Sequence, residues 1–98
     1  MSRPLILRPE AEADLREAKD WYESQREGLA DEFRVCIEEA MDRILRMPEL
    51  QVEIYKGVRR RLVRRFPYAI FYKTEDTRIV VIAVMHAHRK PGRWRARV

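Results

Sequence analysis

The sequence predicts an α+β fold in which a two-helix hairpin packs on a mostly antiparallel, four-stranded sheet, in the order β-α-α-β-β-β. Two segments of the N-terminal half repeat apolar residues at helical spacing. The stretch from residue 58 to residue 85 instead contains three runs of β-type residues. With 98 residues, of which 46% are hydrophobic, we expect residues 1–98 to form a single domain around one core.

The chain begins with a short predicted strand and a helix. The run from Pro4 to Arg8 alternates its apolar residues between two sides, as a strand does. Pro9 suits the first position of a helix, and the acidic residues that follow are favoured by the helix dipole. The helix should end near Gln25, before Gly28. Its apolar face consists of Ala11, Leu15, Ala18 and Tyr22.

A second helix is predicted between Leu29 and Leu45, before Pro48 interrupts the pattern. The link between the helices is short, so the two should form an antiparallel hairpin that covers one face of the sheet. Its apolar stripe contains Leu29, Phe33, Cys36, Ile37, Ala40, Met41, Ile44 and Leu45. Charged pairs at i,i+4 decorate the other side, namely Glu39 with Arg43 and Asp42 with Arg46.

Three strands are predicted in the C-terminal half. The run from Ile79 to Met85 is unbroken, apolar and rich in β-branched residues, which is typical of a strand buried at the centre of a sheet. The run from Tyr68 to Lys73 precedes it, and the polar turn at residues 75–77 joins the two into a hairpin. A third strand from Arg59 to Arg65 should end at Phe66-Pro67, where proline removes a backbone donor. Alternation then places Tyr68, Ile70 and Tyr72 on one face, and Ala69 and Phe71 on the other.

Charge is distributed very unevenly along the chain. Residues 1–57 contain nine Lys/Arg and fourteen Asp/Glu, whereas residues 58–98 contain twelve and two, so the halves carry −5 and +10. A basic surface on the sheet and C-terminus would suit nucleic acid or an acidic protein partner. The single cysteine, the missing signal-peptide pattern and the shortness of the apolar runs predict a cytoplasmic protein with no membrane contact.

The strand from residue 59 to residue 65 carries five arginines, more than a structural strand needs. Because side chains alternate along a strand, only some of them can form one patch. We expect Arg59, Arg61 and Arg65, which share a face with Val63, to be the exposed set. Arg60 and Arg64 share the other face with Leu62, where they are expected to bury their aliphatic stems.

No phosphate-binding glycine loop, Cys-x-x-Cys pair or His-Glu-x-x-His motif is present, so no cofactor and no metal are expected. His86 and His88 lie two apart at the end of the central strand and should face the same way, but a third metal ligand is not evident. Together with Arg61 and Arg89 they have the composition of a metal-free phosphodiester site, in which histidines move protons and arginines stabilise the phosphate. The alternative is that His86 packs at the end of the sheet while the arginines are solvated or bind a partner. Trp94 likewise either stacks on a partner or covers the core.

The residues as a whole resemble the RelE/ParE superfamily of toxins from type II toxin-antitoxin modules. The segment GVRRRLVRRFPYAIFYKTEDTRIVVIAVMHAHRKPGRW is similar to the C-terminal half of these toxins, and the segments LILRPEAEADLREAKDWYES and GLADEFRVCIEEAMDRI are similar to their first strand and helical hairpin. The resemblance implies a small toxin of the kind often named a plasmid stabilization protein, which a cognate antitoxin neutralises. RelE-like members cleave mRNA on the ribosome, whereas ParE-like members inhibit DNA gyrase and have no known catalysis.

The resemblance is closer to ParE than to RelE. Trp94 lies near the position of a tyrosine that RelE-like members commonly use, and arginines occupy the basic strand where those members carry lysines. Neither replacement readily exchanges protons. We therefore expect a gyrase inhibitor that causes growth arrest, with the antitoxin and DNA gyrase as partners and no catalytic residue. The expected target-binding residues are Arg59, Arg61, Arg65, His88, Arg89, Lys90 and Trp94.

Two other functions remain open at this point. One is a metal-independent endoribonuclease that acts on the ribosome and mRNA through Arg61, His86, His88 and Arg89. The other is a degenerate, non-toxic module that binds only an antitoxin or nucleic acid. In each case the antitoxin segment should be acidic and partly apolar, because it must match the basic half of the chain and can add to an exposed sheet edge.

Overall fold

The computed structural model describes residues 3–88 and 90–98. Five strands form one sheet in the order β1-β5-β4-β3-β2, and two long helices cover one of its faces. Strand β1 (Leu5–Leu7) runs parallel to β5 (Ile79–His86), and all other neighbours are antiparallel. The predicted α+β class and the two-helix hairpin are therefore confirmed, and β5 is an interior strand, although β4 is the one at the centre.

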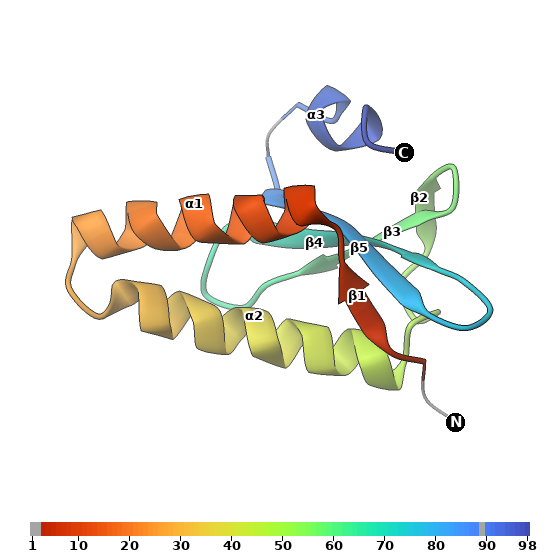
Figure 1. Ribbon diagram of the computed structural model, residues 1–98, viewed down its shortest axis with the longest axis horizontal. Coiled ribbons are helices and arrows are strands. Elements are labelled where there is room, and N and C mark those ends of the chain that lie inside the picture. Colours follow the sequence, from red (N-terminus) through yellow and green to blue (C-terminus); the bar gives the residue numbers. More distant parts are fainter. Residues whose placement is uncertain (1–2, 89) are drawn as a thin grey trace.

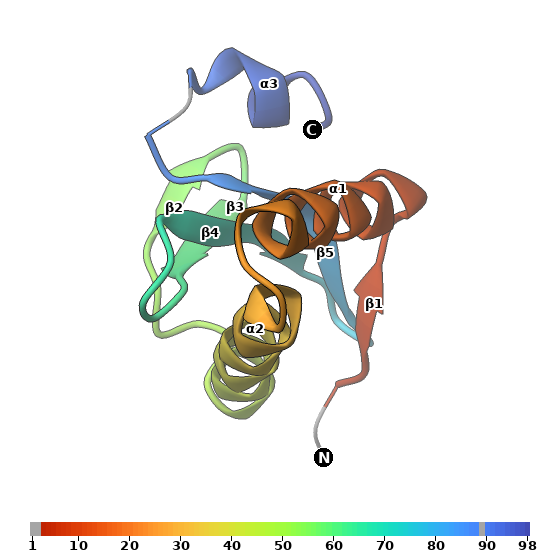
Figure 2. The ribbon, with the colours of Figure 1, turned by 90° about the vertical axis from the view of Figure 1, so that its left-hand side faces the viewer.

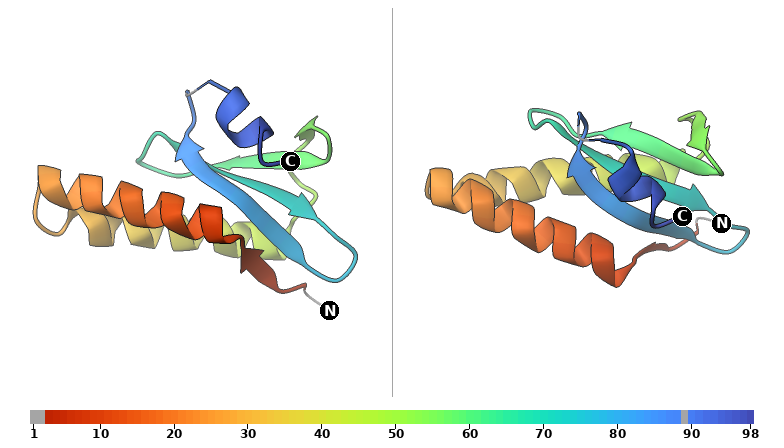
Figure 3. Two further views of the ribbon diagram at one scale, coloured as in Figure 1. Left: turned by 45° about the horizontal axis from the view of Figure 1, so that its top comes forward. Right: turned by 90° about the horizontal axis from the view of Figure 1, so that it is seen from above.

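Helices α1 (Pro9–Gln25) and α2 (Leu29–Arg46) form the predicted antiparallel hairpin, whose turn extends beyond the sheet (Figure 3). Pro9 starts α1, as the sequence indicates. Gly28 adopts a left-handed φ of +87° between the helices, a conformation that glycine reaches without a steric penalty. The carboxylate of Glu23 accepts hydrogen bonds from the backbone N–H groups of Gly28 (3.0 Å) and Ala30 (3.1 Å), which satisfies free donors at the start of α2.

The core has two parts, one on each face of the sheet. On the helix face, the rings of Tyr22, Phe33, Phe66 and Tyr68 pack with centroid distances between 4.9 and 5.9 Å. The alternation predicted for β4 (Tyr68–Thr74) is confirmed, because Ile70 and Tyr72 face the helices whereas Ala69 and Phe71 face away from them. We call this second side the tail face, because the C-terminal segment (residues 90–98) covers it (Figures 1 and 2).

The sheet has one strand more than the predicted four. The additional strand is β2 (Glu53–Tyr55), between α2 and β3 (Val58–Leu62), and the two-residue turn Lys56-Gly57 joins it to β3. Both turn residues have positive φ, +46° and +82°, as a tight hairpin turn of this length requires. A short helix, α3 (Gly92–Arg95), also forms in the tail, where the sequence pattern was too short to predict one.

Strand β3 ends three residues earlier than predicted, at Leu62 rather than Arg65. Arg65 has a left-handed φ of +72°, so the chain turns away before Pro67 and rejoins the sheet at Tyr68. The strict alternation expected for the arginine-rich segment therefore holds only as far as residue 62. No helix among the described residues is long and apolar enough to cross a membrane.

Candidate functional site

Arg59, expected to be exposed, has only 15% of its side chain exposed. In β3 it pairs with Tyr72, whose ring faces the helices, so Arg59 points toward the same side. Its Nη1 donates hydrogen bonds to the carbonyls of Gln51 and Glu49 in the α2–β2 connection, and Nη2 lies 3.7 Å from a carboxylate oxygen of Glu53. The expectation of exposure is therefore wrong: Arg59 fastens this connection to the sheet.

Two further arginines of this segment are tied to α2. Arg64 makes two hydrogen bonds of 3.1 Å to the carboxylate of Glu39, and Arg65 makes one of 2.9 Å to Glu32. The bond from Arg64 holds the pKa of Glu39 below its ordinary value, and Arg26 and Arg65 together do the same for the pKa of Glu32. Because Glu39 pairs with Arg64, it does not form the predicted ion pair with Arg43, whereas Asp42 and Arg46 do pair, at 3.1 Å.

Arg60 and Arg61 are the two arginines of the segment that form no ion pair with a carboxylate of the described residues. They lie on opposite faces of the sheet. Arg60 pairs across strands with Phe71 and is exposed on the tail face, although its stem was expected to be buried. Arg61 pairs with Ile70 and is half-buried on the helix face, beside α2. Arg61 was expected to be exposed and Arg60 to bury its stem, and the structure shows the reverse, because the helices cover the face of the sheet that carries Arg61.

Arg60 belongs to a group of cations on the tail face that the sequence did not indicate. We call Lys56, Arg60, Lys73 and Arg95 the basic cluster. The guanidinium of Arg95 lies 4.6 Å, and the ammonium of Lys56 5.3 Å, from the centre of the Tyr55 ring. Lys73 and Tyr55 are both register partners of Val58, one on each neighbouring strand. No carboxylate in the described part of the chain forms an ion pair with any of the four.

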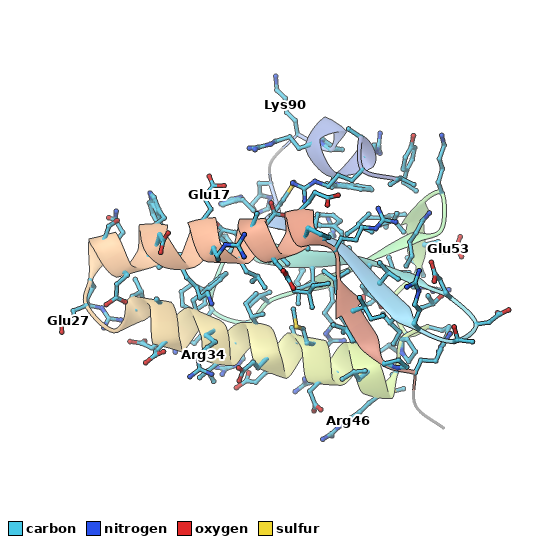
Figure 4. All side chains as sticks on the ribbon, in the orientation of Figure 1. Glu17, Glu27, Arg34, Arg46, Glu53 and Lys90 are labelled. Atoms are coloured by element: carbon cyan, nitrogen blue, oxygen red, sulfur yellow. The ribbon has the colours of Figure 1, made fainter. Side chains whose placement is uncertain are left out.

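Trp94 is the apolar centre beside this cluster. Its ring stacks on Phe71 with centroids 4.7 Å apart, and only 6% of the residue is exposed. The tryptophan therefore covers the tail face of the core, which is one of the two roles considered for it. Lys90, by contrast, is exposed and points away from the body of the protein (Figure 4). The segment thus presents cations to solvent while its tryptophan anchors it.

A groove lies on the helix face between α2 and β3. It consists of two hollows of about 300 and 430 Å³ that share Glu39, Arg43 and Arg61. Exposed apolar residues lie along it, including Met47 (58% exposed) and Leu50 (56%). Neither Arg43 nor Arg61 forms an ion pair with a carboxylate of the described residues. We call this the α2–β3 groove; it combines an apolar floor with unpaired cations.

The histidines lie at the far end of β5. The strand ends at His86, so His88 belongs to the following turn, yet the two rings remain close, with centroids 5.7 Å apart. The backbone N–H of His88 donates to Nδ1 of His86 (3.2 Å), and the His86 ring lies against Tyr68 (5.9 Å). No cluster of three His, Cys, Asp or Glu side chains among the described residues could hold a metal.

Of the residues in the ribonuclease alternative, His86 and His88 lie close together, whereas Arg61 lies apart from them. Arg61 lies two strands away from β5 in the sheet order, a separation of about 10 Å at normal strand spacing, and two register positions from His86. The half-buried aromatic Tyr68 lies against His86 on the side toward β4. Arg89 lies outside the described residues.

Residues 5–91 match the family described as ParE toxin of type II toxin-antitoxin system, parDE. The chain is 27% identical over 99 residues to proteins named Toxin ParE2 from two strains of Mycobacterium tuberculosis, CDC 1551 and H37Rv, covering 100% of this chain and 94% of each relative. A solved structure titled chromosomal ParDE TA system from P. aeruginosa has the same fold, with a TM-score of 0.77 at 18% identity, and the match covers 86% of this chain and 95% of that one.

Proposed function

Because the chain belongs to the ParE toxin family of type II toxin-antitoxin systems, we propose that it arrests growth by inhibiting DNA gyrase and that an antitoxin neutralises it. The family assignment agrees with the resemblance to the RelE/ParE superfamily seen in the sequence, which was closer to ParE than to RelE. The observation that carries the proposal of a gyrase target is the basic cluster, since its four cations have no carboxylate partner among the described residues.

The basic cluster is suited to a polyanionic surface such as DNA held by gyrase. Lysine and arginine side chains bind phosphates and release counterions, which gives affinity without sequence preference. Arg95 is already ordered by its position over Tyr55, so little side-chain entropy is lost when it binds a phosphate. Arg64 and Arg65, which are tied to α2, do not contribute.

The chemistry of the cluster favours binding over cleavage. Metal-free RNA cleavage needs a base and an acid beside the scissile phosphate. Guanidinium groups stay protonated, so Arg60 and Arg95 stabilise charge but do not transfer protons. The two histidines of the chain, His86 and His88, lie at and just beyond the C-terminal end of β5, whereas Lys73 pairs with Val80 near the start of that strand.

The α2–β3 groove is the proposed docking site for the antitoxin. Its exposed apolar residues would take apolar side chains of a partner segment, and its unpaired cations, Arg43 and Arg61, would take carboxylates. The edge of β3 is also open beyond Arg59, because β2 pairs only with Val58 and Arg59. An acidic, partly apolar segment therefore fits this surface, and a short stretch of it can add to the strand edge.

The target is tested by measuring gyrase supercoiling of plasmid DNA, with and without the protein, at a series of defined salt concentrations. We expect the wild-type protein to inhibit the reaction, and Arg60→Gln/Arg95→Gln to weaken inhibition by about thirtyfold, because two charge contacts of roughly 1 kcal/mol each are lost. Arg46→Gln is the matched control, since Arg46 is an exposed arginine paired with Asp42 on α2. Unaffected gyrase would refute the target, and mapping mRNA cuts on translating ribosomes with His86 and His88 variants would follow.

The groove is tested with the purified cognate antitoxin. Met47→Glu and Leu50→Glu place carboxylates where the acidic segment should dock, so antitoxin affinity should fall while toxicity stays unchanged. Ile6→Glu is the control, because Ile6 is an exposed apolar residue on β1, at the opposite edge of the sheet. Equal antitoxin affinity for all three variants would rule out the groove as the docking site.

A further inference from the structure

The hydrogen bonds that attach the C-terminal segment to the body of the protein all involve one residue. Among the described residues, every hydrogen bond between residues 90–98 and the rest of the chain involves Arg97. Its guanidinium donates to both carboxylate oxygens of Asp14, at 2.6 and 3.0 Å, and to the carbonyl of Ile82 at 3.1 Å. Arg8 in turn donates to the backbone carbonyl of Arg97 at 2.8 Å.

Asp14 is the centre of this network and is itself held in place. It lies on α1, its side chain is largely buried, and its Oδ2 also accepts a hydrogen bond from the backbone N–H of Val84 (3.0 Å). Strand β1 pairs with β5 only as far as Val81. The backbone N–H of Val84 therefore has no partner on β1 and donates to the Asp14 carboxylate instead. One carboxylate therefore joins α1, β5 and the C-terminal segment.

The remaining attachment of the segment is apolar. Trp94 stacks on Phe71 and meets the ring of Tyr55 at 5.9 Å, and α3 is only four residues long. A helix of one turn is not stable by itself, so its position depends on contacts with the body. The Arg97–Asp14 pair, with two parallel charge-assisted hydrogen bonds, fixes the direction in which the segment runs over the sheet.

We propose that Asp14 is a positioning residue for target binding: through Arg97 it holds the C-terminal segment on the tail face, where Arg95 joins the strand cations of the basic cluster. The inference rests on the proposed function for the identity of the target, but not for the attachment itself. Without the Asp14–Arg97 pair, Arg95 leaves the Tyr55 ring, and the cluster is divided between a fixed sheet and a detached segment. Asp14 acts in this way from the acidic half of the chain, without touching the target.

The attachment is measured by the accessibility of Trp94 to acrylamide. The chain has two tryptophans, and Trp21 is 56% exposed, so the experiment uses a Trp21→Phe background in which Trp94 is the only tryptophan. Asp14→Asn and Arg97→Gln should raise the quenching constant severalfold. Losing a charge-assisted pair shifts the equilibrium between the docked and the detached C-terminal segment toward the detached state by about tenfold or more. Arg97→Lys keeps one charged donor and should recover part of the protection. Asp20→Asn, an exposed acid on the same helix, is the control and should leave quenching unchanged.

Potency is measured on the same variants, both as inhibition of gyrase and as growth arrest under graded induction. We expect potency to fall in the order of Trp94 exposure, measured at a temperature well below the unfolding midpoint of every variant, since breaking a largely buried ion pair also lowers that midpoint. The proposal would be overturned if Trp94 stayed protected from acrylamide in Arg97→Gln, or if a variant with exposed Trp94 kept full potency. If the wild-type protein arrests growth but leaves gyrase unaffected, the target is wrong, and the order of growth arrest among the variants still decides the role of Asp14.

Discussion

Replacing Arg59 and its neighbour Arg60 separates a structural arginine from a binding one. In Arg59→Met the aliphatic stem is retained, but the hydrogen bonds to the carbonyls of Gln51 and Glu49 are lost. Hydrogen bonds to charged groups contribute about 1.5–3 kcal/mol, and Arg59 is only 15% exposed, so we expect a loss of about 2 kcal/mol of unfolding free energy. The Nε of Arg59 is buried without a partner, so its removal recovers part of the cost and keeps the estimate in the lower half of that range.

The assay is thermal unfolding followed by circular dichroism. For a domain of this size, about 2 kcal/mol lowers Tm by roughly 8–16 °C. Arg60→Met, in contrast, changes an exposed side chain with no ion pair among the described residues and should alter stability by no more than about 0.5 kcal/mol. Gyrase inhibition should show the reverse, with a severalfold loss in Arg60→Met and full potency in folded Arg59→Met. A stable Arg59→Met protein that has lost potency would refute this assignment of faces.

Three further predictions concern stability. Tyr72→Phe should cost about 1–3 kcal/mol in urea unfolding, because the buried Tyr72 hydroxyl donates to the carbonyl of Pro48 at 2.8 Å and its loss leaves that acceptor unpaired; an unchanged midpoint would contradict this. Glu32 and Glu39 have lowered pKa values, so their contribution is complete above about 4.5 and is lost as pH falls through their folded-state values. Glu32→Gln/Glu39→Gln should therefore reduce the fall in urea midpoint between neutral and acidic pH, and an identical pH profile would argue against the pairs. Gly28→Ala should cost about 1 kcal/mol in thermal unfolding, because Gly28 has a φ of +87° that an L side chain adopts only with strain. An added Cβ would have nothing within 4 Å, so a much larger loss would indicate a steric clash and contradict this account.

The sequence predicted most of the fold because its local signals agree with the final packing. Pro9 starts α1, the apolar stripe of α2 is buried, and the β-branched run of β5 lies between two strands. Strand β2 was not predicted as a separate strand because its three residues are too few to show an apolar alternation. The signal that indicates it is Lys56-Gly57, since a two-residue turn ending in glycine joins tight hairpins.

The site was harder to predict because it depends on which face the helices cover. Alternation alone correctly separates Arg60 from Arg59 and Arg61, but it does not reveal which set meets α2. The basic cluster combines cations from the β2–β3 turn, two strands and α3, which are distant in sequence and meet only through Tyr55 and the sheet register. Arg97 and Asp14, 83 residues apart, are likewise joined only by the three-dimensional fold.

The two proposed surfaces share β3 and lie on opposite faces of it, which constrains how neutralisation works. A partner that occupies only the α2–β3 groove leaves Arg60 and the rest of the basic cluster uncovered, because Arg60 faces the other side of the sheet. The route between the surfaces passes the edge of β3 beyond Arg59, which β2 leaves open. Crossing a layer of about 10 Å takes roughly three extended residues. An antitoxin segment that fills the groove and continues by a few acidic residues around this edge would therefore cover the cluster, whereas a version truncated at the groove would bind the toxin without relieving inhibition.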